Sequence, residues 1–138
     1  MTDYPAIFYV EDDEMSRYVM NIILVDQMNL SNVTIFEDST NFVERIEELT
    51  FVPDIIFLDI HMEPIDGFHM LQILRRHEIF SDLPIVALTA SVMNEEVTQL
   101  REVGFDGIIP KPIDLENFPY LLGKLLNGES VWRITRSH

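Results

Sequence analysis

Acidic residues follow two apolar segments of this 138-residue chain with no polar transition between them. Glu11, Asp12 and Asp13 follow "AIFYV", and Asp59 follows "IIFL". A carboxylate at the end of a buried strand loses its hydration, which is costly unless another group compensates for the loss. Either these acids cap neighbouring elements, or they are held there to react.

Two further polar residues occupy equivalent places, because Thr89 follows "IVAL" and Lys111 follows "GIIP". Lys111 is one of only two lysines, and it lies between two prolines that restrict its backbone. Several carboxylates in one crevice repel each other, and a divalent cation that prefers oxygen ligands, such as Mg²⁺, removes this repulsion. Acids beside a single lysine therefore favour phosphoryl chemistry, with Lys111 as a point charge and Thr89 as a hydroxyl donor.

Five apolar segments alternate with segments of helical periodicity, which predicts an α/β domain. Near-continuous apolar strands indicate a parallel sheet with helices on both faces. We therefore expect a flavodoxin-like (βα)5 doubly wound sheet with strand order 2-1-3-4-5, in which the first and third strands are neighbours and their acids meet. The predicted strands are 6–10, 33–36, 54–58, 85–88 and 107–109.

Apolar residues at helical spacing predict one buried face for each intervening helix. Asn94 and Asp114 are the predicted starts of the last two helices. The predicted faces are Met15, Tyr18, Val19, Ile22 and Ile23; Phe42, Val43, Ile46 and Leu49; Met70, Leu71 and Leu74; Met93, Val97 and Leu100; and Leu115, Phe118, Leu122, Leu125 and Leu126.

The composition is that of an ordinary globular domain, with 47% apolar and 24% charged residues. The formal net charge is -15 with only nine basic residues, so we expect no direct contact with nucleic acid. No apolar run reaches the ~18 residues that a membrane span needs. The start has no basic segment typical of a signal peptide and the chain has no cysteine, so the expected compartment is the cytoplasm.

Four segments together resemble the receiver domain of bacterial two-component response regulators. "IFYVEDDE" is similar to its first strand and acidic cluster, and "FLDIHMEPIDG" to its phospho-acceptor loop. "PIVALTAS" and "IIPKPID" are similar to its Thr-Ala and Lys-Pro signatures. Each segment alone is a weak match, but their order is specific. The likeness covers roughly residues 6–127, so we expect a receiver domain over residues 1–127.

The resemblance implies that a sensor histidine kinase transfers a phosphoryl group to this protein, with Mg²⁺ as cofactor. The resemblance also implies that the protein is not a conventional enzyme, because a receiver catalyses only its own phosphorylation and slow dephosphorylation. The implied roles are Asp59 as phospho-acceptor; Glu11, Asp12, Asp59 and the backbone carbonyl of His61 as metal ligands; and Thr89 and Lys111 as partners of the phosphoryl group.

Two departures from the family pattern affect the site. Glu63 stands where the family commonly has proline, which comes one residue later. Ile108 stands where many receivers carry an aromatic residue that moves together with Thr89, so Phe105 or a repacking of the fourth helix is an alternative route for the signal. The two positions that often tune phosphate lifetime are His61 and Ser91, and we hypothesise that His61 shields or orients the attacking water.

The segment after Asn127 has eleven residues, "GESVWRITRSH". It is too short for an output domain, so the expectation is a stand-alone receiver that signals by docking to a target protein. The alternative is a relay that passes the phosphoryl group to a histidine phosphotransfer protein. The tail, residues 128–138, is either a frayed terminus or an arm in which Trp132 packs on its own body or on a twin subunit.

The same residues also permit alternative roles. The acids from Glu11 to Asp13 could cap a helix, and Asp59 could be an ion-pair partner of Lys111. A Mg²⁺-dependent aspartyl-phosphate hydrolase similar to haloacid dehalogenases would need an acid where His61 stands. A degenerate receiver that only binds partners would normally lack the acceptor or the lysine. A nucleotide-binding protein is disfavoured, because no glycine-rich loop follows the first strand.

Overall fold

Five parallel strands pair in the order β2-β1-β3-β4-β5, which confirms the predicted sheet. The computed structural model describes residues 4–132. Apolar residues form five short strands, and the three central strands are buried at every position, as expected for a sheet covered on both faces, whereas the edge strand 33–36 is mostly half-buried. The strands are β1 (Ile7–Val10), β2 (Val33–Phe36), β3 (Ile55–Asp59), β4 (Ile85–Thr89) and β5 (Gly107–Pro110).

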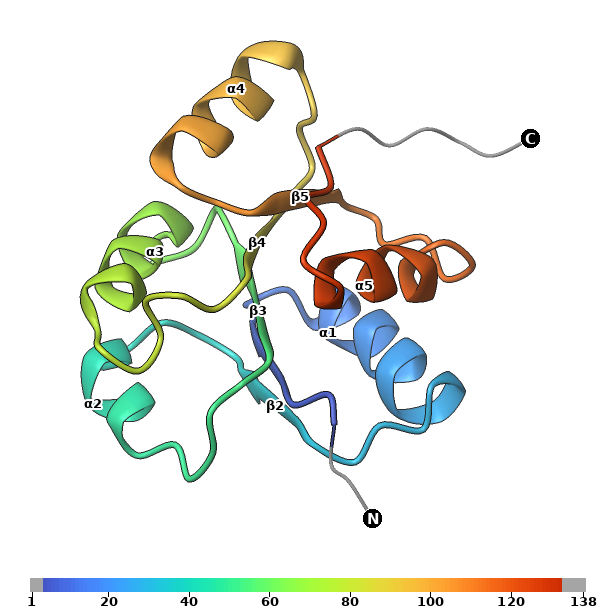
Figure 1. Cartoon of the computed structure of the whole chain (residues 1–138), viewed down its shortest axis with the longest axis horizontal. Helices are drawn as coiled ribbons and strands as arrows, with labels where there is room; N and C mark the ends of the chain where they lie inside the picture. The colour runs from blue at the N-terminus through green and yellow to red at the C-terminus, as the bar shows by residue number, and fades with distance from the viewer. Residues whose placement is uncertain (1–3, 133–138) are drawn as a thin grey trace.

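Helices cover both faces of the sheet, with α1 and α5 on one face and α2, α3 and α4 on the other (Figure 1). Within residues 4–132, no helix has the length and apolar character of a membrane span. The helices are α1 (Glu14–Asn21), which continues as the π-helix η1 (Ile22–Gln27), α2 (Phe42–Glu47), α3 (Gly67–Arg76), α4 (Asn94–Val103) and α5 (Phe118–Leu126).

The alternation of side chains along each strand divides the interior into two apolar cores. In β1, Phe8 and Val10 face the α2–α4 core, whereas Ile7 and Tyr9 face the α1/α5 core. Burial of this apolar surface, worth about 25 cal/mol per Å², is the main force that fixes the sheet and its carboxyl edge.

The predicted buried face of the first helix is correct only in part: Ile23 is buried and Val19 packs against the α1/α5 core, but two other members of the face are exposed. Met15 and Tyr18 are 66% and 64% exposed, whereas Met20, Ile23 and Leu24 are fully buried. Met20, Ile23 and Leu24 are themselves spaced i, i+3 and i+4, so the apolar pattern also fits this neighbouring face, and it is this face that packs on the sheet.

Smaller corrections concern the starts of two helices. α4 begins at Asn94 as predicted, but Met93 is only its exposed N-cap residue. The Asp114 carboxylate accepts the Glu116 N–H at 3.0 Å in a turn, and α5 begins later, at Phe118. Leu115 therefore lies outside the helix, 42% exposed, and Val43 in α2 is likewise 43% exposed.

The described part of the predicted tail, up to Trp132, lies against the sheet. Val131 forms an isolated parallel bridge with Gly107 of β5, and Trp132 packs against the α2–α4 core. Residues 133–138 lie outside the described part of the chain. The role as a dimerisation arm remains a prediction.

Candidate functional site

The carboxyl ends of β1 and β3 bring the predicted acids together, because these strands are neighbours. Glu11, Asp12 and Asp59 each offer a carboxylate oxygen, and these three atoms lie within 4.8 Å of one another. Glu11 and Asp59 are 0% and 4% exposed, whereas Asp12 is exposed. Three carboxylates face a single lysine, so the site carries an excess of negative charge. A cation that prefers oxygen ligands, such as Mg²⁺, fits this donor set.

Lys111 lies between the two buried acids. Its Nζ is 3.1 Å from Glu11 Oε2 and 3.6 Å from Asp59 Oδ2. Its backbone N–H donates to the Thr89 carbonyl at 2.8 Å, which holds the end of β5 against β4. Burial lowers the pKa of Lys111, but the carboxylates of Glu11 and Asp59 outweigh this, so its pKa is raised and it stays charged.

Asp59 is held in an environment that opposes its ionisation. Burial, and then the hydrogen bond and charge of Glu11, raise the pKa of Asp59 to about 8, although the charge of Lys111 acts in the opposite direction. Its Oδ1 accepts the His61 N–H at 3.3 Å. A cation beside this carboxyl would favour its charged form.

Tyr9 is a site residue that the sequence reasoning missed. Its fully buried hydroxyl donates to Glu11 Oε1 at 2.9 Å, and the Asp13 N–H donates to Glu11 Oε2 at 3.2 Å. Burial, first of all, raises the pKa of Tyr9 above its ordinary value, so the hydroxyl remains a donor. The available signal was strand periodicity, which places Tyr9 and Glu11 on the same face of the chain.

A capping role holds for only one of the three consecutive acids. Asp13 is the N-cap of α1, where its Oδ2 accepts the backbone N–H and the hydroxyl of Ser16 at 2.9 and 2.7 Å. These bonds lower the pKa of Asp13. The backbone carbonyl of Glu11 accepts instead from Arg17 Nη1 at 3.0 Å, which ties the acidic turn to α1.

The remaining predicted residues divide between the site and the interior. Thr89 is buried at the end of β4, and its Oγ1 accepts the Ser91 N–H at 3.1 Å. His61 is exposed two residues after Asp59. Phe105 and Ile108, which we predicted as switch residues, are buried in the α2–α4 core and not at the site itself.

A hollow of about 460 Å³ opens beside Asp12 and follows the loop between β3 and α3. Gly67 begins α3 under this loop, and its N–H donates to the Ile60 carbonyl at 3.0 Å. A Cβ at Gly67 would lie 2.8 Å from the Asp59 carbonyl oxygen, so glycine permits this close approach. The lining residues are Asp12, Ile60, His61, Met62, Glu63, Asp66 and Phe68.

A family model described as "Response regulator receiver domain" matches residues 7–122. This chain belongs to the response regulator receiver domain family. The match confirms the resemblance on which the sequence prediction depended, and it covers all five strands of the sheet.

Curated relatives of this receiver include both regulators and kinases. The transcriptional regulator RpaA of Synechocystis is 39% identical over 112 residues, which are 81% of this chain and 45% of RpaA. Stress response regulator protein 1 of Candida tropicalis is 27% identical over 83% of this chain and 42% of its own length. Histidine kinase 1 of Arabidopsis thaliana is 43% identical over 44% of this chain and 5% of the kinase. The receiver thus spans less than half of each of these relatives.

Solved structures share its fold. The chemotaxis response regulator CheY4 of Vibrio cholerae has a TM-score of 0.75 at 22% identity, over 87% of this receiver and 97% of that chain. The receiver domain of the sensor histidine kinase PA1611 of Pseudomonas aeruginosa, solved with magnesium in its active-site cleft, has a TM-score of 0.75 at 22% identity. That match covers 89% of this receiver and 98% of that chain.

Proposed function

We propose that this receiver accepts a phosphoryl group on Asp59 and signals by a change in its docking to other proteins. The observation that carries the proposal is a buried carboxyl at a sheet edge, with Asp12 and Glu11 on one side and Lys111 3.6 Å away. A structural ion pair alone would not need two further acids in the same crevice.

Asp12, Asp59 and the His61 carbonyl would hold Mg²⁺ directly. Glu11 would not bind the ion directly, since its two carboxylate oxygens already accept hydrogen bonds from Tyr9, Asp13 and Lys111. When bound, the ion supplies positive charge to the phosphoryl oxygens. The magnesium in the cleft of the PA1611 receiver supports this assignment.

In the transfer, an oxygen of Asp59 forms a bond to phosphorus while the bond from phosphorus to the donor imidazole nitrogen breaks. Lys111 neutralises charge on the phosphoryl oxygens, and the Thr89 hydroxyl turns from accepting the Ser91 N–H to donating to the phosphoryl group. The protein contributes position and charge, as in other phosphoryl transfers.

A sensor histidine kinase is the proposed donor, which the histidine kinases among the relatives support. The proposed recipient of the signal is a target protein; the alternative is a histidine phosphotransfer protein that takes the phosphoryl group onward. The proposed residues that tune phosphate lifetime are His61, whose N–H donates to the acceptor, and Ser91, whose N–H donates to the Thr89 hydroxyl. An unchanged half-life of the phosphorylated His61→Ala variant would remove His61 from this role.

Acetyl phosphate with Mg²⁺, read by intact mass, tests the proposal. The wild type gains one phosphoryl group, Asp59→Asn gains none, and the exposed control Asp26→Asn behaves as wild type. Phosphorylation of Asp59→Asn to the wild-type extent would refute the assignment. Steady phosphate release from a phosphomonoester would favour the hydrolase instead.

A further inference from the structure

Ser39 is a fully buried polar residue at the carboxyl edge of the sheet, in the loop between β2 and α2. Its Oγ accepts the Ile65 N–H at 2.9 Å, and Ile65 belongs to the loop between β3 and α3 that follows Asp59. The two bonded residues are 26 positions apart, so this hydrogen bond joins two separate loops. Both loops lead into helices on the same face of the sheet, α2 and α3 (Figure 1). Ser39 therefore attaches the loop after Asp59 to its neighbour.

The turn that carries Ser39 is itself held by hydrogen bonds. Asp38 Oδ1 accepts the Thr40 N–H at 3.0 Å. From α2, Arg45 Nη1 donates to the Asp38 carboxylate at 2.9 Å, and to the carbonyls of Asp38 and Thr40 at 3.1 and 3.0 Å. Its guanidinium carbon also lies 4.0 Å from the centre of the Phe36 ring at the end of β2. The Ser39 hydroxyl thus projects from a fixed turn.

The acceptor loop, residues 60–66, depends on such an attachment for its position. The Gly67 N–H donates to the Ile60 carbonyl at 3.0 Å, which closes the loop but does not fix it relative to the neighbouring loops. On the side of Asp12 the loop borders the hollow of about 460 Å³, where the protein leaves open space. The bond from the Ile65 N–H reaches the turn after β2 and supplies a fixed point on that side.

We propose that Ser39 is a positioning residue for the acceptor site. Its bond to Ile65 keeps the acceptor loop, and with it the His61 carbonyl, where that carbonyl can join Asp12 and Asp59 around one cation. This inference rests on the proposed function, because it concerns the proposed Mg²⁺ ligands. Ser39 acts through the backbone of the loop and contacts neither the ion nor the phosphoryl group. Groups that orient metal ligands without touching the metal change its affinity when they are removed.

Calorimetric titration of the full chain with Mg²⁺ tests this role. Ser39→Ala deletes the acceptor of the Ile65 N–H, so we expect Mg²⁺ to bind about five- to tenfold more weakly than to the wild type. Hydrogen exchange followed by mass spectrometry should show faster exchange in residues 60–68 of this variant. The control is Ile23→Val, which loses a methyl group from the α1/α5 core and should keep the wild-type affinity.

The rate of phosphorylation by acetyl phosphate gives an independent readout. For Ser39→Ala, the Mg²⁺ concentration that gives half the maximal rate should rise by the same factor as the dissociation constant. The rate at saturating Mg²⁺ should stay within about twofold of the wild type. A purely structural role, which lowers only the stability of the folded protein, would move neither the affinity nor this concentration.

Far-UV circular dichroism checks that each variant is folded. If Ser39→Ala does not fold, Arg45→Met, which keeps the packing on Phe36 but deletes the donors to the turn, carries the comparison with an expected loss of about two- to threefold. Wild-type Mg²⁺ affinity in the variant used, or an equal loss in Ile23→Val, would overturn the role of Ser39, while phosphorylation at Asp59 would leave the proposed function intact. A wild type that neither binds Mg²⁺ nor accepts a phosphoryl group would instead refute the proposed function, and this inference with it.

Discussion

At the scale of single residues, Asp59 is the group whose proton matters most. Its pKa in the folded protein is about 8, against an ordinary value of 3.8. Between these two values the folded protein holds a proton that the unfolded chain has released. Without a divalent cation, the stability of the wild type therefore falls as pH rises through this window and levels off above it, the reverse of the behaviour of a salt-bridged aspartate.

Asp59→Asn removes this effect. In buffer with a chelator, we expect the variant to be more stable than the wild type by about 1 to 3 kcal/mol at pH 8, with the difference shrinking toward pH 4. Urea unfolding at several pH values measures it. A difference that stays constant with pH would contradict the buried, protonated acid.

Tyr9→Phe tests the role of the Tyr9 hydroxyl, which the sequence did not predict as part of the site. The change deletes only the hydroxyl that donates to buried Glu11, so we expect a loss of about 1 to 2 kcal/mol in the free energy of unfolding and weaker binding of Mg²⁺. Exposed Tyr18→Phe is the matched control. Mg²⁺ titration by calorimetry separates a role in the site from a purely structural role, which would leave the affinity unchanged.

The sequence predicted the acidic cluster, Asp59, Thr89 and Lys111, because each follows an apolar segment and parallel strands share one carboxyl edge. It did not predict the contact between Tyr9 and Glu11. Tyr9 reads as one more apolar strand residue, and only the path of the Glu11 side chain determines where its hydroxyl bonds. Side-chain packing likewise determines that Lys111 lies closer to Glu11 than to Asp59, which the sequence did not predict.

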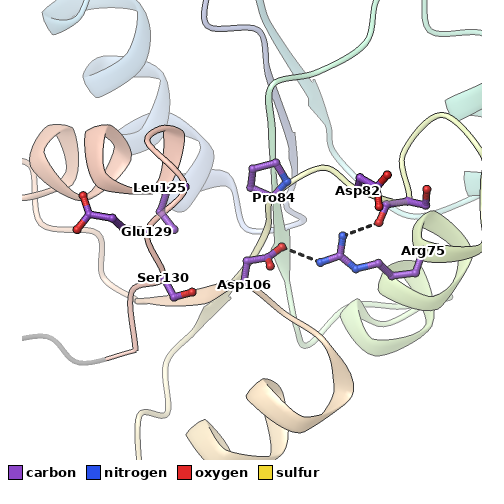
Figure 2. Close-up of a pocket in the computed structure, with 9 residues that line it drawn as sticks. Arg75, Asp82, Pro84, Asp106, Leu125, Glu129 and Ser130 are labelled. Carbon is purple, nitrogen blue, oxygen red and sulfur yellow. Dashed lines mark hydrogen bonds and ion pairs between the residues drawn. The ribbon is translucent and has the colours of Figure 1, made fainter.

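At the scale of elements, Arg75 of α3 joins the segments that lead into β4 and β5, and Figure 2 shows it paired with Asp106. From α3 its guanidinium donates to the Ser81 and Leu83 carbonyls at 3.1 and 2.7 Å. It also donates to the Gly104 carbonyl and, at 2.7 Å, to Asp106, which itself accepts the Ile85 N–H. A lysine cannot reproduce this planar set of donors.

We therefore expect Arg75→Lys to lower the free energy of unfolding by about 1 to 3 kcal/mol, while exposed Arg76→Lys changes it little. Phosphorylation by acetyl phosphate should remain in both variants, since Arg75 lies away from Asp59. Thermal unfolding followed by circular dichroism gives the comparison. Equal stability of the two variants would contradict the assigned role.

Element order and sheet topology were predictable, because apolar strands and helical spacing repeat regularly along the chain. The buried side of the first helix was not. Two adjoining faces of this helix carry apolar residues at helical spacing, and packing on the sheet, which periodicity does not describe, selects the face of Met20, Ile23 and Leu24. Met93 and Leu115 are exposed for another reason: periodicity extends a helix beyond the residue where its cap or turn ends it.

At the scale of the whole molecule, a continuous apolar path links the site to the tail. Phe68 lines the hollow beside Asp12, and its ring lies 6.3 Å from that of Phe105 in an edge-to-face contact. Phe105, Ile108 and Trp132 belong to or pack against one core. A rearrangement at the acceptor can therefore reach β5 and α4 through packed side chains.

Trp132 is the only tryptophan of the chain, so its fluorescence reports on this path. If phosphorylation weakens docking of segment 130–132, acetyl phosphate with Mg²⁺ should shift the emission to longer wavelength as the ring gains contact with water. Asp59→Asn should give no shift. If the spectrum is unchanged in a sample that mass spectrometry shows to be phosphorylated, phosphorylation at the site does not affect the packing of the tail.

Chemical mapping of the residue that carries the phosphoryl group tests directly whether Asp59 is the acceptor. Borohydride reduces an aspartyl phosphate to homoserine, so protein treated with acetyl phosphate and Mg²⁺, then reduced and digested, carries the change at one position. We predict homoserine at residue 59. Homoserine at Asp12 or at another acid, with residue 59 unchanged in phosphorylated protein, would contradict the assignment of the acceptor.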